Sequence, residues 1–220
     1  MNSEIKKFTW NYLDSNMYVL EHKNNFLVID PIDSTEALNG FKNAETITVL
    51  LSHEHFDHIS GLNRLRKLEK CETVVIANEE CSNRIQDPKR NMSLYADVLM
   101  ALAEKPVTEI LKPFVCTKAD ITFNDSYSSD WFGLKVSLVS TPGHSPGSIC
   151  IGVNNLLFSG DTLLENRFMN RFPGGNTKVF KKKTVPVLKQ LLEKVDYVYP
   201  GHGMVISRET ALQILDNNVL

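Results

Sequence analysis

A cluster of histidine and aspartate side chains follows a short apolar run in the first quarter of the chain. Residues 51–58 read LSHEHFDH, which places three imidazoles and an aspartate within six positions. In an extended backbone, residues two apart point the same way, so His53, His55 and Asp57 are expected on one side and His58 on another. Imidazole and carboxylate groups bind zinc, and also iron or manganese. The segment therefore predicts a metal site in which one loop serves two ions.

Three further loops carry a histidine or an aspartate at the end of an apolar run. They read TPGHSPG at 141–147, FSGDT at 158–162 and PGHG at 200–203. Loops at strand ends, held by a rigid sheet, are where ligands and catalytic groups converge. Together, the four loops supply seven candidate metal ligands: His53, His55, Asp57, His58, His144, Asp161 and His202.

In order and context, these motifs resemble the signature of the metallo-beta-lactamase superfamily of hydrolases. Within it, the resemblance is strongest to the hydroxyacylglutathione hydrolase (glyoxalase II) branch, through SGDTL at 159–163, PGG at 173–175 and YPGHG at 199–203. The resemblance implies a ligand set for each of two metals and a bridge between them. The first set is His53, His55 and His144, the second is Asp57, His58 and His202, and the bridge is Asp161.

Length and composition predict one α/β domain spanning residues 1–220. The chain has 42% hydrophobic residues, which is enough to bury a sizeable core at this length. The alternation of strand-like and helix-like runs predicts α/β structure with mixed sheets. The resemblance adds a four-layer αββα sandwich of two mixed sheets, with the metals at the sheet edge between the two halves.

Apolar runs and turn residues mark the expected elements. Strands are expected at 8–10, 17–20, 26–30, 46–51, 74–76, 134–139 and 195–199. Helices are expected at about 35–42, at 59–68 and from about 208, with Ser34 and Ser207 capping the first and last. Residues 115–140 suggest an antiparallel second half. In the segment 79–105, one helical face either covers a sheet or forms part of a substrate lid: Leu94, Val98, Leu99 and Leu102.

The net charge and the composition of the N-terminus limit the classes of binding partner and the location that the sequence predicts. The formal net charge of -2 gives no large field of one sign, so neither nucleic acid nor a membrane surface is indicated as a partner. Residues 1–7 lack the apolar core of a signal peptide, and no run of about eighteen apolar residues occurs, so the default expectation is cytoplasmic. The four cysteines lie outside the metal-like motifs and are expected to be free thiols. A small-molecule substrate is expected, and a homodimer is left open.

The ligand types predict hydrolytic chemistry. Two divalent cations, zinc first and iron or manganese as alternatives, would lower the pKa of a bridging water from about 15.7 toward about 7 and so produce a hydroxide nucleophile. This hydroxide would attack the carbonyl of a thioester or an ester. Asp57 is the candidate catalytic residue because it is placed to orient the nucleophile and to receive its proton. Asp30, before a proline, either fixes a ligand loop or serves as a turn acid.

Substrate recognition is less defined by the sequence. Arg167 and Arg171 are candidate anion-binding residues, although NRF at 170–172 matches the Gly-Arg-Thr-Asp pattern of the resembled family imperfectly. Glyoxalase II enzymes carry a further C-terminal helical region that helps to bind glutathione. This chain ends 18 residues after His202, so that region is expected to be missing.

Several activities would use the same ligands. A lactonase is the nearest alternative, and a phosphodiesterase or nuclease fits the metals but usually brings a basic arm or an inserted domain. A persulfide dioxygenase on the same scaffold would use one iron. A beta-lactamase is disfavoured because those enzymes do not share the bridging aspartate, and a non-catalytic role is disfavoured because all seven ligands are present.

Overall fold

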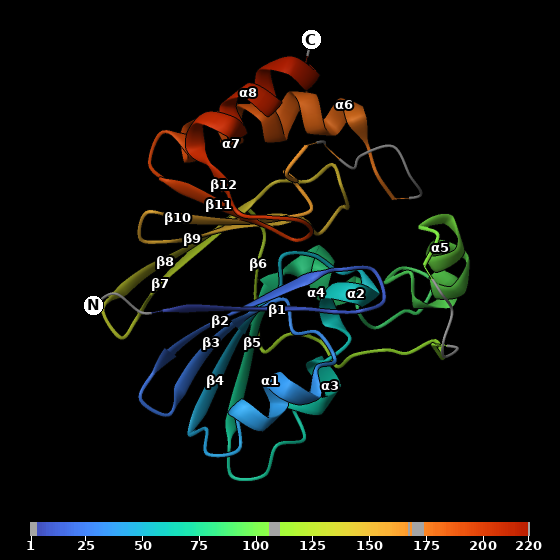
Figure 1. Cartoon of the computed structure of the whole chain (residues 1–220), viewed down its shortest axis with the longest axis vertical. Helices are drawn as coiled ribbons and strands as arrows, with labels where there is room; N and C mark the ends of the chain where they lie inside the picture. Colours follow the sequence, from blue (N-terminus) through green and yellow to red (C-terminus); the bar gives the residue numbers. More distant parts are fainter. Residues whose placement is uncertain (1–3, 106–110, 167, 169–173, 220) are drawn as a thin grey trace.

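Two six-stranded sheets pack face to face, and helices cover the outer face of each (Figure 1). The computed structural model describes residues 4–105, 111–166, 168 and 174–219. The first sheet comes from the N-terminal half of the chain, and the second comes from the C-terminal half. This is the αββα sandwich of two mixed sheets that the resemblance implies, and the sequence prediction of mixed sheets is confirmed.

The first sheet begins with antiparallel strands and continues with parallel ones. Its strands, in spatial order, are β1 (Ile5–Thr9), β2 (Asn16–His22), β3 (Asn25–Ile29), β4 (Thr46–Leu50), β5 (Glu72–Asn78) and β6 (Ile121–Phe123). The helices that follow these strands are α1 (Thr35–Gly40), α2 (Phe56–Ile59), α3 (Leu62–Leu65), α4 (Glu79–Arg84), η1 (Ser93–Tyr95) and α5 (Ala96–Leu102). Ser34 caps α1 as predicted, because its hydroxyl accepts from the backbone N–H of Ala37.

The second sheet is antiparallel except for one parallel pair, β10 with β11. Its strands are β7 (Ser126–Trp131), β8 (Leu134–Ser140), β9 (Ile149–Val153), β10 (Leu156–Gly160), β11 (Tyr197–Pro200) and β12 (Ile206–Ser207). The helices on its outer face are α6 (Thr177–Val179), the π-helical turn η2 (Phe180–Thr184), α7 (Val185–Leu192) and α8 (Arg208–Val219) (Figure 1). Ser207 caps α8, as predicted, by accepting from the N–H of Thr210.

Two sequence expectations are wrong in ways that the packing explains, and exposure bears on a third point that the sequence left open. The helix expected at 59–68 is split into α2 and α3 around Gly61, where a β-carbon would lie 2.2 Å from the carbonyl oxygen of Ile32. Strand β6 joins the first sheet in parallel to β5, so the antiparallel half starts only at β7. Of the helical face left open between a sheet cover and a lid, Leu94, Val98 and Leu102 are exposed, whereas Leu99 packs against the hydrophobic core.

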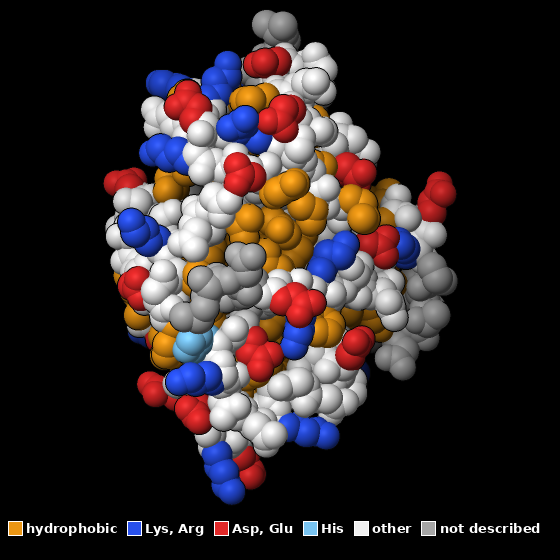
Figure 2. Space-filling model, turned by 60° about the vertical axis from the view of Figure 1, so that its left-hand side comes forward, with side chains coloured by type: hydrophobic (Ala, Val, Ile, Leu, Met, Phe, Trp, Pro, Cys, Tyr) orange, Lys and Arg blue, Asp and Glu red, His pale blue; other side chains and the backbone are white. Residues whose placement is uncertain are grey.

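Charged side chains of both signs are interspersed over the surface, as Figure 2 shows for one face, where hydrophobic side chains gather near the centre. All four cysteines are free thiols, as predicted. Among the helices that the structure describes, none combines the length and the apolar composition that a membrane span requires.

Aromatic side chains fill the interface between the two sheets. The ring of Tyr18 on β2 lies 5.2 Å from that of Phe158 on β10 and 5.5 Å from that of Tyr199 on β11. Leu50 on β4 and Leu138 on β8 are fully buried in the same cluster. Because these contacts join opposite sheets, they fix the position of one half of the molecule on the other.

The substitution Phe158→Ala tests this interface. Loss of a buried ring leaves a cavity, so we expect the free energy of unfolding to fall by about 3–5 kcal/mol, measured by urea denaturation. Leu94→Ala, at an exposed position, is the control and should change it by less than about 0.5 kcal/mol. Equal effects of the two substitutions would contradict the proposed role of Phe158.

Candidate metal centre

The candidate ligands all lie at one edge of the sandwich, where strands of both sheets end. The segment after β4 supplies the first four ligands, of which two precede α2 and two lie in its first turn. The turn after β8 carries His144, the end of β10 carries Asp161, and the end of β11 carries His202. Parallel β10 and β11 bring the last two together, since Gly160 pairs with Pro200.

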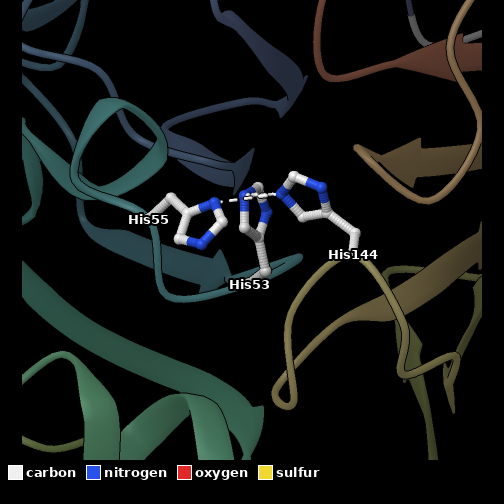
Figure 3. A group of neighbouring side chains, drawn as sticks. All are labelled: His53, His55 and His144. Atoms are coloured by element: carbon white, nitrogen blue, oxygen red, sulfur yellow. Dashed lines mark hydrogen bonds between the residues drawn. The ribbon is translucent and has the colours of Figure 1, made fainter. Parts of the chain in front are cut away.

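Three imidazoles converge in the first group of ligands (Figure 3). Nε2 of His144 lies 3.2 Å from Nε2 of His53 and 3.0 Å from Nδ1 of His55. Nitrogen ligands about 2.0–2.1 Å from a tetrahedral metal are about 3.3 Å apart, so this spacing fits one cation between them. All three side chains are buried.

A second group lies beside the first and contains both nitrogen and oxygen donors. Nε2 of His58 is 3.2 Å from Nε2 of His202, and Oδ2 of Asp57 lies 3.4 Å and 3.3 Å from these two atoms. The expectation that Asp57 shares a side with His53 and His55 is wrong. Helix α2 begins at Phe56, so the extended alternation stops there and Asp57 joins His58 instead.

Asp161 lies between the two groups. Its Oδ2 is 3.5 Å from Nε2 of His144 in the first group and 3.4 Å from Nε2 of His202 in the second. Its Oδ1 is buried and has no hydrogen-bond partner, although Nε2 of His58 is 3.5 Å away. A buried carboxylate oxygen without a donor is costly unless a cation contacts it. This unpaired oxygen and the ligand spacing fit a pair of metal ions.

Burial and neighbouring charges set the pKa values of the two carboxylates. Burial opposes ionisation of Asp161, but His202, His58 and His144 outweigh it and hold its pKa well below the usual range. Burial also acts to raise the pKa of Asp57, and His58 and His202 again lower it. Both groups are therefore anionic at neutral pH.

The imidazoles divide into two kinds. Burial first, then the neighbouring imidazoles, lowers the pKa of His53 well below its usual range, and burial followed by His144 lowers that of His55 to about 3. For His58, burial acts to lower the pKa, but Asp57 and Asp161 outweigh it and raise the value to about 9. The first group is thus neutral and ready to bind a cation, whereas a cation in the second group must displace protons.

Hydrogen bonds on the far ring nitrogens aim the ligand nitrogens inward. Nδ1 of His58 lies 3.1 Å from Oδ2 of Asp30, and Nδ1 of His202 lies 3.0 Å from the carbonyl oxygen of Leu13. Donation from each Nδ1–H leaves Nε2 free for a metal. Asp30 also accepts from the N–H and hydroxyl of Ser52, next to His53. Of the two sequence readings for Asp30, these contacts match the one in which it fixes a ligand loop.

Glu54 is a buried residue whose contacts the sequence analysis did not predict. Its carboxylate accepts from the hydroxyl of Ser145 at 2.7 Å and lies 3.6 Å from Nε of Arg84. Burial raises its pKa to about 7. Glu54 therefore links the first ligand loop to the loop that carries His144. Strand alternation predicts that Glu54 faces away from His53 and His55, but nothing in the sequence identifies its partner.

A cavity of about 560 Å³ opens onto the ligands. Five ligands line it: His55, Asp57, His144, Asp161 and His202. Structural zinc sites are closed and usually contain thiolates, whereas this site has none and faces a cavity. The sequence-predicted Arg167 and Arg171 lie outside the described residues.

A model of a known family covers most of the chain. It is described as the metallo-beta-lactamase superfamily and matches residues 10–202. The chain belongs to the metallo-beta-lactamase superfamily. All seven candidate ligands of this superfamily member lie within the matched range.

Curated relatives of this superfamily member are distant. It is 26% identical over 200 residues to "Probable metallo-hydrolase YqgX" of Bacillus subtilis (strain 168), which covers 89% of this chain and 84% of the relative. It is 25% identical over 179 residues to the hydroxyacylglutathione hydrolase of Aeromonas salmonicida (strain A449), covering 80% of this chain but 53% of that protein. The chain thus spans about half the length of the second relative.

Solved structures share the fold. The crystal structure of BLEG-1 B3 metallo-beta-lactamase matches with a TM-score of 0.76 and 23% identity, covering 96% of this chain and 97% of that one. The crystal structure of TTHA1623 in a di-iron-bound form matches with a TM-score of 0.66 and 24% identity, covering 95% and 98%. At these identities, the likeness establishes the fold alone.

Asp30→Asn tests how the ligand loop is held. The amide keeps the shape of Asp30, but its NH2 group donates and cannot accept, so Ser52 or His58 loses an acceptor. We therefore expect metal affinity to fall about 10–100-fold. The measurement is competition of the metal-loaded protein with a chelator of known affinity. Asp33→Asn is the control, because that exposed side chain pairs with Arg64 away from the ligands. Unchanged affinity in Asp30→Asn would exclude this role.

Proposed function

We propose that the chain is a dinuclear metal-dependent hydrolase that cleaves a thioester or ester bond of a small-molecule substrate. The observation that carries the proposal is the pair of ligand groups, each with donor atoms 3.0–3.4 Å apart, that share Asp161 between them. The two curated relatives support hydrolysis, since one is named as a metallo-hydrolase and the other as a hydroxyacylglutathione hydrolase.

In this proposal, His53, His55 and His144 hold one cation and Asp57, His58 and His202 hold the other, with Asp161 as the bridge. Imidazole and carboxylate donors suit zinc, the first expectation, and also iron or manganese. The di-iron form of one solved relative is the support for iron. When bound, the cations would lower the pKa of a shared water toward about 7 and polarise the substrate carbonyl.

The side chains have separate tasks in this reaction. Asp57 is anionic and lines the cavity, so it can orient the attacking water and accept its proton. His202 is half-buried, whereas the other six ligands are buried, and it lies at the cavity, where a substrate would arrive. Asp30 and Glu54 contact ligand loops but not the cavity, so they position the ligands rather than touch substrate.

Asp161→Ala removes the proposed bridge. We expect metal content to fall from two ions toward one or none and turnover to drop by at least about 100-fold, because one oxygen of Asp161 lies within 3.5 Å of Nε2 of both His144 and His202. Metal analysis of the purified protein and the initial hydrolysis rate are the measurements. Asp97→Ala, at an exposed position on α5, is the matched control and should leave both unchanged. Full activity with two metals in Asp161→Ala would refute the bridging role.

The pH dependence of hydrolysis gives a second test. The attacking water must lose a proton before it becomes a nucleophile. His58, whose pKa is raised by Asp57 and Asp161, must lose its proton before it binds a cation. Because both losses are favoured at higher pH, kcat/KM should rise as pH increases from about 5 to about 8. Initial rates on protein of known metal content are measured with one substrate across this range. A flat profile would contradict activation of water at this site.

A substrate screen decides between the activities that this ligand set permits. Metal-loaded protein is offered thioesters, esters, lactones and phosphodiesters, and a persulfide with oxygen consumption as the readout. Cleavage of thioesters or esters that stops on chelation and returns with metal supports the proposal. Preference for a lactone or a phosphodiester would change the substrate class, and oxygen uptake with one bound iron would replace hydrolysis by oxidation.

A further inference from the structure

The wall of the cavity beyond the ligands is apolar. Six residues from three parts of the chain form most of it: Leu13, Phe56, Met92, Leu99, Leu102 and Ala103. Leu13 belongs to the turn between β1 and β2, Phe56 begins α2, and Met92 precedes η1 and α5. A substrate that reaches Asp57 and Asp161 therefore lies against hydrocarbon on the side of α5.

The described part of the wall offers no basic side chain to an anionic substrate. Asp14 is its charged residue outside the ligand set, and it forms an ion pair with Lys105. Lys7 lies near the same rim, where its amine donates to the carbonyl oxygen of Gly203 at 3.4 Å. A negative group on the part of the substrate that lies against this wall would meet Asp14 and hydrocarbon. Divalent cations would offset the charges of Asp57 and Asp161, so it is the wall, and not the ligands, that disfavours a charged substrate chain.

Leu102 exposes apolar surface that a bound apolar chain would cover. It lines the cavity, yet 77% of its surface is exposed. Val98, one helical turn earlier on the same face, is 60% exposed but does not line the cavity. Covering apolar surface near the ligands is favourable by about 25 cal/mol per Å². Leu102 is therefore placed to contact substrate, and Val98 serves as its matched control.

Two contacts hold this wall in place beside the ligands. The carbonyl of Leu13 accepts from His202, so the same turn orients a ligand and supplies part of the wall. The Lys105–Asp14 ion pair links the end of the α5 segment to that turn. The apolar wall and the second ligand group thus belong to one connected assembly.

We propose that the substrate is an uncharged ester or thioester that carries an apolar chain of several carbons, and that this chain lies between the β1–β2 turn and α5. This inference rests on the proposed hydrolase function and names its substrate class. A volume of about 560 Å³ lies within the range of small-molecule sites, about 300–1,000 Å³, so the cavity admits such a chain together with the scissile group.

Two homologous series test the proposal on the metal-loaded full chain. In one, N-acetylcysteamine thioesters carry acyl groups from acetyl to decanoyl, and in the other, acetate esters carry alcohols of the same lengths. Burial of a methylene is worth up to about fourfold, so kcat/KM should rise about two- to fourfold per methylene in one series until the cavity is filled. The series that responds identifies whether the acyl group or the leaving group occupies the wall.

Matched variants locate the effect. Leu102→Ser should lower kcat/KM for the octanoyl or octyl substrate about three- to tenfold while changing that for the shortest substrate less than twofold. Val98→Ser should change neither, because its side chain does not line the cavity. Both positions are exposed, so circular dichroism and metal content should match those of the unsubstituted protein.

The outcomes separate this inference from the function on which it rests. Hydrolysis of both series with no dependence on chain length, or an equal effect of the two serine variants, overturns the apolar substrate and leaves the hydrolase intact. Faster turnover of anionic S-lactoylglutathione than of the neutral octanoyl thioester would also overturn the apolar substrate and leave the hydrolase function intact. No hydrolysis of any ester or thioester by protein with two bound metals overturns both proposals.

Discussion

The packing of the two sheets determines whether the site exists, because each ligand group draws residues from both halves of the chain. Tyr18 of β2 packs against Phe158 and Tyr199 of the opposite sheet, and its hydroxyl donates to the carbonyl of Pro200 at 2.7 Å. Pro200 lies two residues before His202. The same side chain therefore holds the sheets together and fixes the loop that completes the second ligand group.

The ligand edge concentrates buried charge that needs counter-charges, either protons or metal cations. Asp57 and Asp161 are anionic and buried, and Asp161 keeps one oxygen without a donor. Asp57 and Asp161 raise the pKa values of His58 and His202. Without a cation, these two imidazoles therefore hold protons as counter-charges. Cations at these positions would replace those protons. Metal binding and the stability of this edge are thus linked through the same four side chains.

The same edge joins two environments with different chemistry. Polar contacts such as Asp30 with His58 lie behind the ligands, and apolar side chains such as Leu99 and Leu102 lie in front of them. The first set orients ring nitrogens, whereas the second lines the cavity with hydrocarbon. Leu13 takes part in both, because its carbonyl accepts from His202 and the residue lines the cavity.

The sequence by itself determined the ligand types, their loops and most strands, because apolar runs bounded by turns and closely spaced histidines are local patterns. It also predicted the caps at Ser34 and Ser207, which depend on residues three positions apart. Only the tertiary structure decided that Asp57 joins His58, that Glu54 meets Ser145, and that part of α5 is exposed beside a cavity. These features depend on which distant segments meet, and contacts between segments remote in sequence leave no periodic signal in either segment alone.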